Sequence, residues 1–436
     1  MLPKLPLLLF FVIGLLGTLP AQKRLDRARG YFAAGDYRAA EQEIAAAGRG
    51  IRTKPEARLL LAVSRLQLNK LNEAADLLTG LVEEKKEPYP VANYYLGRTL
   101  QLQHRFVPAA EYYKRYLRSL SANAPERRLT IELIRSCDNG RQLIERTPRL
   151  VVENLGTEVN SIYDEFAPIP SPTRGGRLYF SALNPANSGG AADRRGGTAG
   201  GERFFSDIYT TETQGVNWMP ARPLDYTLNS PRHEVLLDIS PDGRRLYYYQ
   251  GSSAEDGNFL LDTFQQTADR RLTTYPLDAP LDARVGDGTP FFFGKNLILF
   301  SSSRPGGMGG LDIYRVRRRN DGGWTQPENL GPRINSAYDE TTPFLANDGR
   351  TLYFSSNDAA QSIGGYDVLR AYLIEDTDTW TQAENPGLPL NSAADDTHFR
   401  LAYDAFTAYL CSDRPDGYGE RDLYVVYYQD PQEEMD

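Results

Sequence analysis

The sequence predicts a multidomain protein, with an N-terminal helical solenoid followed by a five-bladed β-propeller. Apolar and small residues recur every 34 to 35 positions in the first half of the 436-residue chain, and an Asp-hydrophobic-Tyr-like motif recurs every 50 to 55 positions in the second. Fixed periods of these sizes are typical of repeat architectures. The net charge also changes, from +8 over residues 22–147 to −17 over 148–436. We therefore expect a signal peptide over 1–21, a helical domain over 22–147 and a propeller over 148–436.

Residues 1–21 have the pattern of a secretory signal. Lys4 is the only charge before an apolar run from Leu5 to Leu19, and Pro20-Ala21 follows. This order predicts export with cleavage near Ala21, and an uncleaved membrane anchor is the alternative. No later stretch reaches about 18 apolar residues, so no membrane span is expected after cleavage. We expect a periplasmic protein. The outer membrane is the membrane with which it would associate.

The first domain has the period of tetratricopeptide repeats. Small residues in such repeats let paired helices approach, and large residues fill the space between them. Pro55 and Pro90 stand where helices should begin, because proline is tolerated in a first turn. A further helix over about 125–146 would cap the last of three repeats. The residues that share the period are Tyr37, Leu71 and Phe106, and Ala40, Ala74 and Ala109.

The second domain repeats a blade-like unit. Each unit has an acidic start, a strand, an Asp-Gly turn, a second strand, a Gly-rich loop and a third strand that begins at an aspartate. Asp348-Gly349 shows the turn, which needs a positive φ. A fourth strand is expected at residues 324–331, and four short strands per unit are typical of a propeller blade. The aspartates of the third strands are Asp207, a degenerate copy at Asp262, Asp312, Asp367 and Asp422.

The two ends of the array predict how the ring closes. The last unit stops after its third strand, at residues 422–428. Before the first unit, residues 149–156 end in Asn154-Leu155-Gly156, which matches Asn329-Leu330-Gly331 of a later fourth strand. We expect strand 149–156 to pair with residues 422–428, which would remove an exposed edge and close five blades.

Charge and cysteine content narrow the class of protein. Nucleic acid is not an expected partner, because the larger domain of this exported chain is acidic. The charge difference is explained by two solvated surfaces, or by surfaces that attract each other or different partners. Cys137 and Cys411 lie in different domains. An exported chain permits a disulfide, but two buried free thiols are the favoured interpretation.

Catalytic patterns are not found in the sequence. His104, His233 and His398 are the only histidines, and none has the spacing of a metal ligand. We expect no enzyme activity, no metal and no cofactor.

The recurring aspartates and nearby arginines are candidate interaction residues. Asp312, Asp367 and Asp422 would bind Ca²⁺ in one interpretation. In the favoured one, each accepts backbone hydrogen bonds and fixes its own blade's turn. Arg304 and Arg414 stand at matched loop positions, where they pair with those aspartates or face a ligand.

The helical domain offers a second candidate surface. Its repeats are expected to form a concave face that holds an extended, acidic protein segment. Arg65, Asn93 and Arg98 on the first helices of the repeats are the candidate residues, and a solvated helix face is the simpler interpretation for each.

The repeat motifs resemble those of a known family. Residues 304–314, 324–331 and 348–356 resemble the TolB-type propeller repeats of Gram-negative envelope proteins. The join from Cys137-Asp138-Asn139-Gly140 to Asn160-Ser161 resembles the subfamily with tetratricopeptide repeats before this propeller, including PorE-like components of type IX secretion and gliding machinery. The resemblance covers about 22–436 and implies envelope proteins, including secretion components, as partners. PorE-like members continue into an OmpA-like domain, which this chain lacks, so peptidoglycan binding is not expected.

The resulting prediction is a non-enzymatic envelope scaffold with two protein-interaction modules. The alternative is a module that binds a small ligand or glycan in the propeller channel. A third class, an enzyme resembling propeller lyases or hydrolases, would need a His/Tyr/Asp cluster in one pocket.

Overall fold

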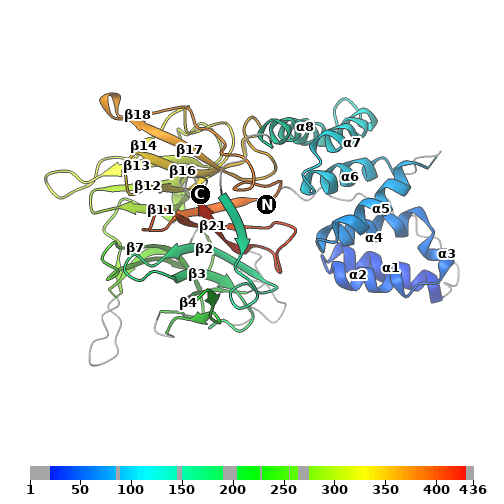
Figure 1. Ribbon diagram of the computed structural model, residues 1–436, viewed down its shortest axis with the longest axis horizontal. Helices are drawn as coiled ribbons and strands as arrows, with labels where there is room; N and C mark the ends of the chain where they lie inside the picture. Colours follow the sequence, from blue (N-terminus) through cyan, green and yellow to red (C-terminus); the bar gives the residue numbers. More distant parts are fainter. Residues whose placement is uncertain are drawn as a thin grey trace, which may run out of the picture. The chain divides into compact units, whose positions relative to one another are not determined.

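The computed structural model describes residues 20–84, 89–144, 150–189, 204–225, 228–254, 256–263 and 274–428 (Figure 1). The chain forms two compact units, residues 1–145 with 363–365 and residues 146–362 with 366–436. The first contains helices and the second contains sheets, as the sequence predicted. The expected signal peptide lies outside the described residues up to Leu19, and helix α1 begins at Pro20. No helix within the described ranges is long and apolar enough to cross a membrane.

Three helical hairpins make up most of the first unit, and their turns share one backbone conformation. The turns after α1, α4 and α6 contain Gly35, Asn69 and His104, with φ of 78°, 58° and 56°. A left-handed residue at this point ends a helix and lets the chain reverse. The helices of the described chain are α1 (Pro20–Ala33), α2 (Tyr37–Ala45), α3 (Arg49–Arg52), α4 (Pro55–Gln67), α5 (Leu71–Val82), α6 (Val91–Leu102), α7 (Phe106–Ser119) and α8 (Glu126–Leu143).

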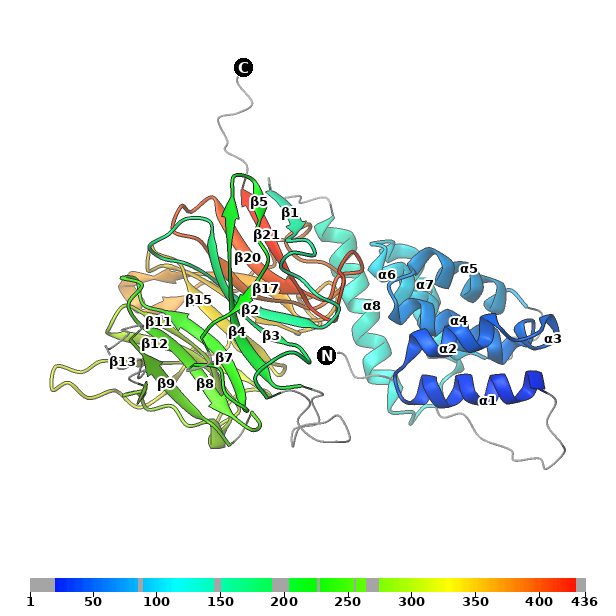
Figure 2. The ribbon, with the colours of Figure 1, turned by 90° about the horizontal axis from the view of Figure 1, so that it is seen from below.

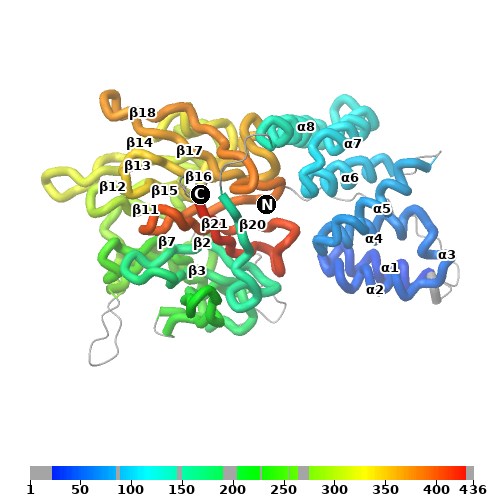
Figure 3. The backbone as a smooth tube through the Cα atoms, viewed as in Figure 1, coloured from blue at the N-terminus to red at the C-terminus, as the bar shows by residue number. Residues whose placement is uncertain are grey.

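The periodic residues of the sequence have equivalent places in these hairpins. Tyr37, Leu71 and Phe106 are the first residues of α2, α5 and α7. Helices α6, α7 and α8 lie side by side (Figure 3). Two glycines allow these helices to pack closely. A Cβ on Gly97 of α6 would lie 2.8 Å from the Tyr113 ring, and one on Gly140 of α8 would lie 2.5 Å from the Phe106 ring. The alanines Ala40, Ala74 and Ala109 are each 0% exposed.

Five antiparallel sheets form the blades of the propeller, as the sequence predicted. The first blade is β2 (Asp164–Pro170), β3 (Arg177–Leu183), β4 (Ser206–Gln214) and β5 (Asn217–Trp218), with β6 (Arg222–Pro223) also paired to β4. The second is β7 (His233–Ile239), β8 (Leu246–Gly251), β9 (Asn258–Asp262) and β10 (Thr274–Pro276). The third is β11 (Asp287–Phe293), β12 (Leu297–Ser302), β13 (Asp312–Arg317) and β14 (Glu328–Asn329). The fourth is β15 (Glu340–Leu345), β16 (Thr351–Ser356), β17 (Asp367–Ile374) and β18 (Thr379–Trp380). The fifth is β19 (Asp396–Leu401), β20 (Thr407–Ser412), β21 (Asp422–Tyr428) and β1 (Leu150–Asn154).

Strand β1 completes the last blade. It pairs antiparallel with β21, with Leu150 opposite Tyr428 and Asn154 opposite Tyr424 (Figure 2). This is the pairing expected from the Asn-Leu-Gly motif. The first strand of the propeller therefore supplies the outer edge of the sheet formed by its last three strands.

Two details differ from the sequence-based prediction. The outer strand expected over 324–331 is regular only at Glu328 and Asn329, with a separate bridge between Trp324 and Arg318. The degenerate copy at Asp262 was placed at the wrong end of its strand. Asp262 ends β9 opposite Leu246, whereas Asn258, opposite Gln250, has the position of the other aspartates. The even 55-residue spacing from Asp207 concealed this shift.

Other local predictions are confirmed. Gly243 and Gly349 of the Asp-Gly turns have φ of 68° and 67°. Cys137 and Cys411 are buried free thiols.

Candidate functional site at the propeller axis

The innermost strands of all five blades are irregular where they surround the axis. Each of β2, β7, β11, β15 and β19 shifts register against its neighbour midway along the strand. In four of them the irregular segment holds a non-glycine residue at positive φ: Ala167 (53°), Thr289 (42°), Thr342 (50°) and His398 (55°). Such a conformation costs on the order of 1 kcal/mol per residue, and it is often found at functional sites.

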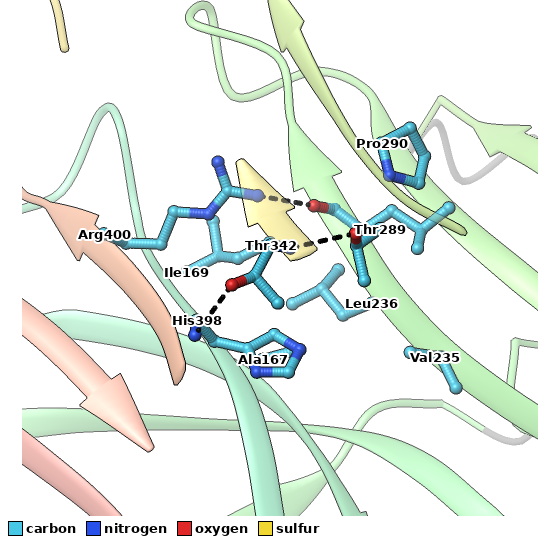
Figure 4. Close-up of a pocket in the computed structure, with 10 residues that line it drawn as sticks. Ala167, Ile169, Val235, Leu236, Thr289, Pro290, Thr342, His398 and Arg400 are labelled. Atoms are coloured by element: carbon cyan, nitrogen blue, oxygen red, sulfur yellow. Dashed lines mark hydrogen bonds between the residues drawn. The ribbon is translucent and has the colours of Figure 1, made fainter. Parts of the chain in front are cut away.

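These irregular segments enclose a cavity of about 30 Å³. That volume holds one or two water molecules or one small ion. Figure 4 shows Thr289, Thr342, His398 and Arg400 around it. The Thr342 N–H donates to Thr289 Oγ1 at 3.1 Å, and the His398 N–H donates to Thr342 Oγ1 at 3.3 Å. Hydrogen bonds therefore connect the third, fourth and fifth blades around the cavity. The lining residues are Ala167, Ile169, Val235, Leu236, Leu237, Thr289, Pro290, Thr342, His398 and Arg400.

Arg400 brings a positive charge to the axis. Its guanidinium lies 4.8 Å from the Phe291 ring centroid and 5.4 Å from that of Phe344, and Nη2 donates to the Leu237 carbonyl at 3.1 Å. Burial lowers the pKa of Arg400, and the charge of Asp238 opposes this effect. Burial also raises the pKa of the Asp238 carboxyl.

His398 and Cys411 form a contact that the sequence did not reveal. His398 Nδ1 lies 3.4 Å from Cys411 Sγ, and the Thr397 hydroxyl lies 3.0 Å from both atoms. Burial lowers the pKa of His398 to about 3 and raises that of Cys411 to about 11. A cysteine nucleophile needs the thiolate and access to solvent, and here both groups are neutral and Cys411 is 0% exposed. The other histidines lie apart, with His104 in a helix turn and His233 beside Ser206.

The recurring aspartates bond to the loops of their own blades. Asp312 Oδ2 accepts the Met308 N–H at 2.6 Å, and Asp422 Oδ2 accepts the Tyr418 N–H at 2.6 Å. Asp367 Oδ2 accepts the Asn385 side-chain amide at 2.6 Å. The Gly-rich loops are close-packed on these carboxylates, since a Cβ on Gly307 would lie 2.0 Å from Asp312 Oδ2. No cluster of three metal-ligating side chains occurs in the described part of the chain.

The loop arginines pair with the acid that begins the first strand of the blade, and not with the third-strand aspartate proposed from the sequence. Arg304 Nη2 contacts both carboxylate oxygens of Asp287, at 2.6 and 2.7 Å. Arg414 contacts Asp396 Oδ1 through Nε at 2.9 Å and Nη2 at 2.7 Å. Arg414 Nη1 also donates to the Pro389 carbonyl at 3.0 Å.

The helical candidates offer less open surface than the sequence indicated. Arg65 Nε lies 3.1 Å from Glu41, and Arg65 Nη1 lies 3.1 Å from Glu73. Asn93 is 1% exposed, because nine of the twelve residues of α6 are buried. Arg98, on the same helix, is partly buried.

An Asn-Ser pair between blades is the repeated feature that the sequence reasoning missed. The side-chain amide of Asn229 accepts the Ile208 N–H at 2.9 Å and donates to the Ile208 carbonyl at 3.1 Å, which joins the first blade to the second. The adjacent Ser230 gives its N–H to Glu234 at 3.0 Å, at the start of the next blade. The recurrence of Asn-Ser five residues before an acid was the available signal. The equivalent asparagines are Asn160, Asn335 and Asn391.

The chain has only distant likenesses to known proteins among those compared. No protein-family model matches the chain, and no curated protein sequence matches it. Among solved structures, TolB from Acinetobacter baumannii is 15% identical with a TM-score of 0.34, over 57% of this chain and 52% of that one. The chain thus spans about half the length of that TolB. The α-L-arabinofuranosidase of Lactobacillus brevis is 16% identical with a TM-score of 0.36, over 61% and 90% of the two chains. The NanB sialidase of Streptococcus pneumoniae is 10% identical with a TM-score of 0.32, over 64% and 58%. Likenesses of this size assign no function.

Proposed function

We propose that the protein is a non-enzymatic scaffold of the cell envelope that binds other proteins through its two modules. The observation that carries this proposal is the use of the recurring charged residues. Asp312, Asp367 and Asp422, with Arg304 and Arg414, are bonded within the propeller. The carboxylates and guanidinium groups that could form a metal or catalytic site are therefore engaged in hydrogen bonds and ion pairs within the repeats. Function then depends on the module surfaces, which in repeat proteins bind macromolecules.

The location and the machinery follow from the sequence patterns. The signal-like N-terminus supports a periplasmic site, at or near the outer membrane. The helical hairpins have the length of tetratricopeptide repeats. The repeat motifs support membership of the PorE-like group. Such membership would give the protein a role in or near type IX secretion and gliding.

The cavity at the propeller axis bears on the alternative of a glycan or small-ligand module. Pockets for such ligands usually have volumes of about 300–1,000 Å³. The axial cavity of about 30 Å³ is too small for a sugar ring. A glycan would therefore have to bind at a place other than this cavity.

The helical module is expected to bind an acidic protein segment. Arg105, Arg118 and Arg135 are exposed cations, and none forms an ion pair within the described residues. Their attraction for an acidic partner would be screened by salt, because the Debye length is about 8 Å at physiological ionic strength.

Crosslinking and capture from envelope fractions test the proposal with the full chain as bait. The first variant replaces Arg105, Arg118 and Arg135 by serine. The matched control removes Arg222, Arg232 and Arg244, which are exposed propeller cations with no ion pair among the described residues. We expect the first variant to lose most of the captured protein at low salt and the control to retain it.

Two results would change the proposal. Loss of capture in the propeller control alone would assign the binding surface to the propeller. If the full wild-type chain captures no protein but binds to a glycan array, the alternative function is favoured.

A further inference from the structure

Arg400 lines the axial cavity, and one of its hydrogen-bond donors is unused. Arg400 Nη1 is enclosed and has no hydrogen-bond partner. The ion pairs of the described blades engage Arg304, Arg414 and Arg421, but none engages Arg400. An enclosed charge without an ion-pair partner is costly, and an unsatisfied donor adds on the order of 1–3 kcal/mol. Sites of this kind are usually completed by a bound water or ion.

The nearest acid does not complete the site. Asp238 acts on the charge of Arg400, but its carboxylate is occupied by backbone donors. Oδ2 accepts the Phe292 N–H at 3.0 Å and Oδ1 accepts the Ile239 N–H at 2.9 Å. The aromatic rings of Phe291 and Phe344 cover the guanidinium without supplying an acceptor in its plane.

The cavity limits the size and charge of what can be bound. Its volume of about 30 Å³ admits a single small ion or one to two waters. Thr289, Thr342 and His398 line it beside Arg400 (Figure 4). A cation would meet the guanidinium charge, and a whole organic acid exceeds the volume of the cavity. A monatomic anion matches both the charge and the volume.

We propose that the propeller axis is a binding site for a monatomic anion of halide size, held by Arg400. The ion accepts a hydrogen bond from Nη1 and neutralises the guanidinium at the point where the inner strands of the five blades meet. Binding at the axis would then stabilise the closed ring, since a ligand of the folded state shifts the unfolding equilibrium.

Thermal unfolding of the full chain in sodium bromide and in sodium gluconate, at equal ionic strength, tests the site. Gluconate is too large for the cavity. We expect a higher midpoint in bromide, by about 2 °C for a chain of this size. The difference should disappear in Arg400→Met and persist in Arg350→Met, which removes an exposed arginine.

Asp238→Asn provides a variant with the opposite expectation. Removing the negative charge should lower the bromide concentration needed for half of the stabilisation, by roughly threefold or more. Anomalous diffraction from wild-type crystals grown in bromide should place a peak beside Arg400 Nη1. These two measurements keep the proposal testable if Arg400→Met does not fold. Equal midpoints in the two salts, or a bromide effect that persists in Arg400→Met, would overturn it and leave water in the cavity.

Discussion

Asn160 holds Leu423 through both groups of its side-chain amide. Oδ1 accepts the Leu423 N–H at 2.8 Å, and Nδ2 donates to the Leu423 carbonyl at 3.0 Å. The two residues are 263 positions apart in the sequence. The same amide donates to Asn154 Oδ1 of strand β1 at 2.9 Å, so one buried side chain connects the first blade, the last blade and the strand that closes the ring.

We expect Asn160→Ala to lower the free energy of unfolding by about 1–3 kcal/mol, because it leaves the buried Leu423 N–H without its partner, whereas the Leu423 carbonyl keeps the Leu155 N–H. Urea denaturation of the full chain measures this change. Asn217→Ala, at an exposed position of β5, should change the free energy by less than about 0.5 kcal/mol. Similar values for the two variants would contradict the structural role of Asn160.

Removing β1 should open the ring. A propeller that begins at residue 146 retains the pairing of β1 with β21, and one that begins at residue 160 leaves β21 as an exposed edge strand. We expect the shorter chain to aggregate and to melt at a clearly lower temperature. Light scattering and thermal unfolding distinguish the two chains, and equal melting temperatures would refute the closure model.

Arg304→Met should destabilise the third blade. Asp287 has no exposed side-chain surface and would keep a buried charge without its partner, which costs about 3–5 kcal/mol. Arg350→Met breaks an exposed pair with Glu375 and should cost less than about 1 kcal/mol. Unfolding free energies of the two variants make the comparison. An unchanged stability for Arg304→Met would instead favour a role in ligand binding.

Gly140→Ala should weaken the packing of α8 on α7. The new Cβ would lie 2.5 Å from the Phe106 ring, and such overpacking costs about 1–3 kcal/mol. Gly30→Ala in α1 is the control, because a Cβ there meets no atom within 4 Å. Alanine also favours a helix over glycine by up to about 1 kcal/mol, so the control should unfold at the same or a higher temperature. Circular dichroism at 222 nm, the usual probe of helix content, follows both.

The buried glutamates should make stability depend on pH. Burial raises the pKa of Glu165 and of Glu234 to about 7, and hydrogen bonds from Ser161 and Ser230 oppose this effect. An unfolded glutamate has a pKa of about 4.3. Each group therefore contributes its full stability below about pH 4.3, and this contribution is lost as the pH rises to about 7.

We expect Glu165→Gln to lose less stability than the wild type between pH 5 and pH 8, by up to about 3 kcal/mol. Denaturant unfolding at the two pH values measures the difference. Glu212→Gln replaces an acid whose pKa is lowered mainly by a hydrogen bond from Arg177, so it should not reduce the loss. A parallel pH dependence of wild type and Glu165→Gln would show that Glu165 is ionised in the folded protein.

The sequence by itself determined the architecture, because repeats make local patterns recur. The 34- to 35-residue period placed Tyr37, Leu71 and Phe106 at the starts of three helices. The Asn-Leu-Gly motif identified the closing strand, since an outer strand missing from the last blade must come from elsewhere in the chain. Where one blade departs from the pattern, as at Asp262, even spacing gave the wrong residue.

Only the tertiary structure decided which side chains meet. The partners of Arg304 and Arg414, the contact of His398 with Cys411 and the place of Arg400 at the axis join residues from different strands, which no local period relates. The packing of the helices and strands also decided which side chains are exposed. Asn93 has the sequence position of a surface residue, but the packing around α6 encloses it. Patterns in a sequence predict which elements form, while pairing and exposure depend on how those elements pack.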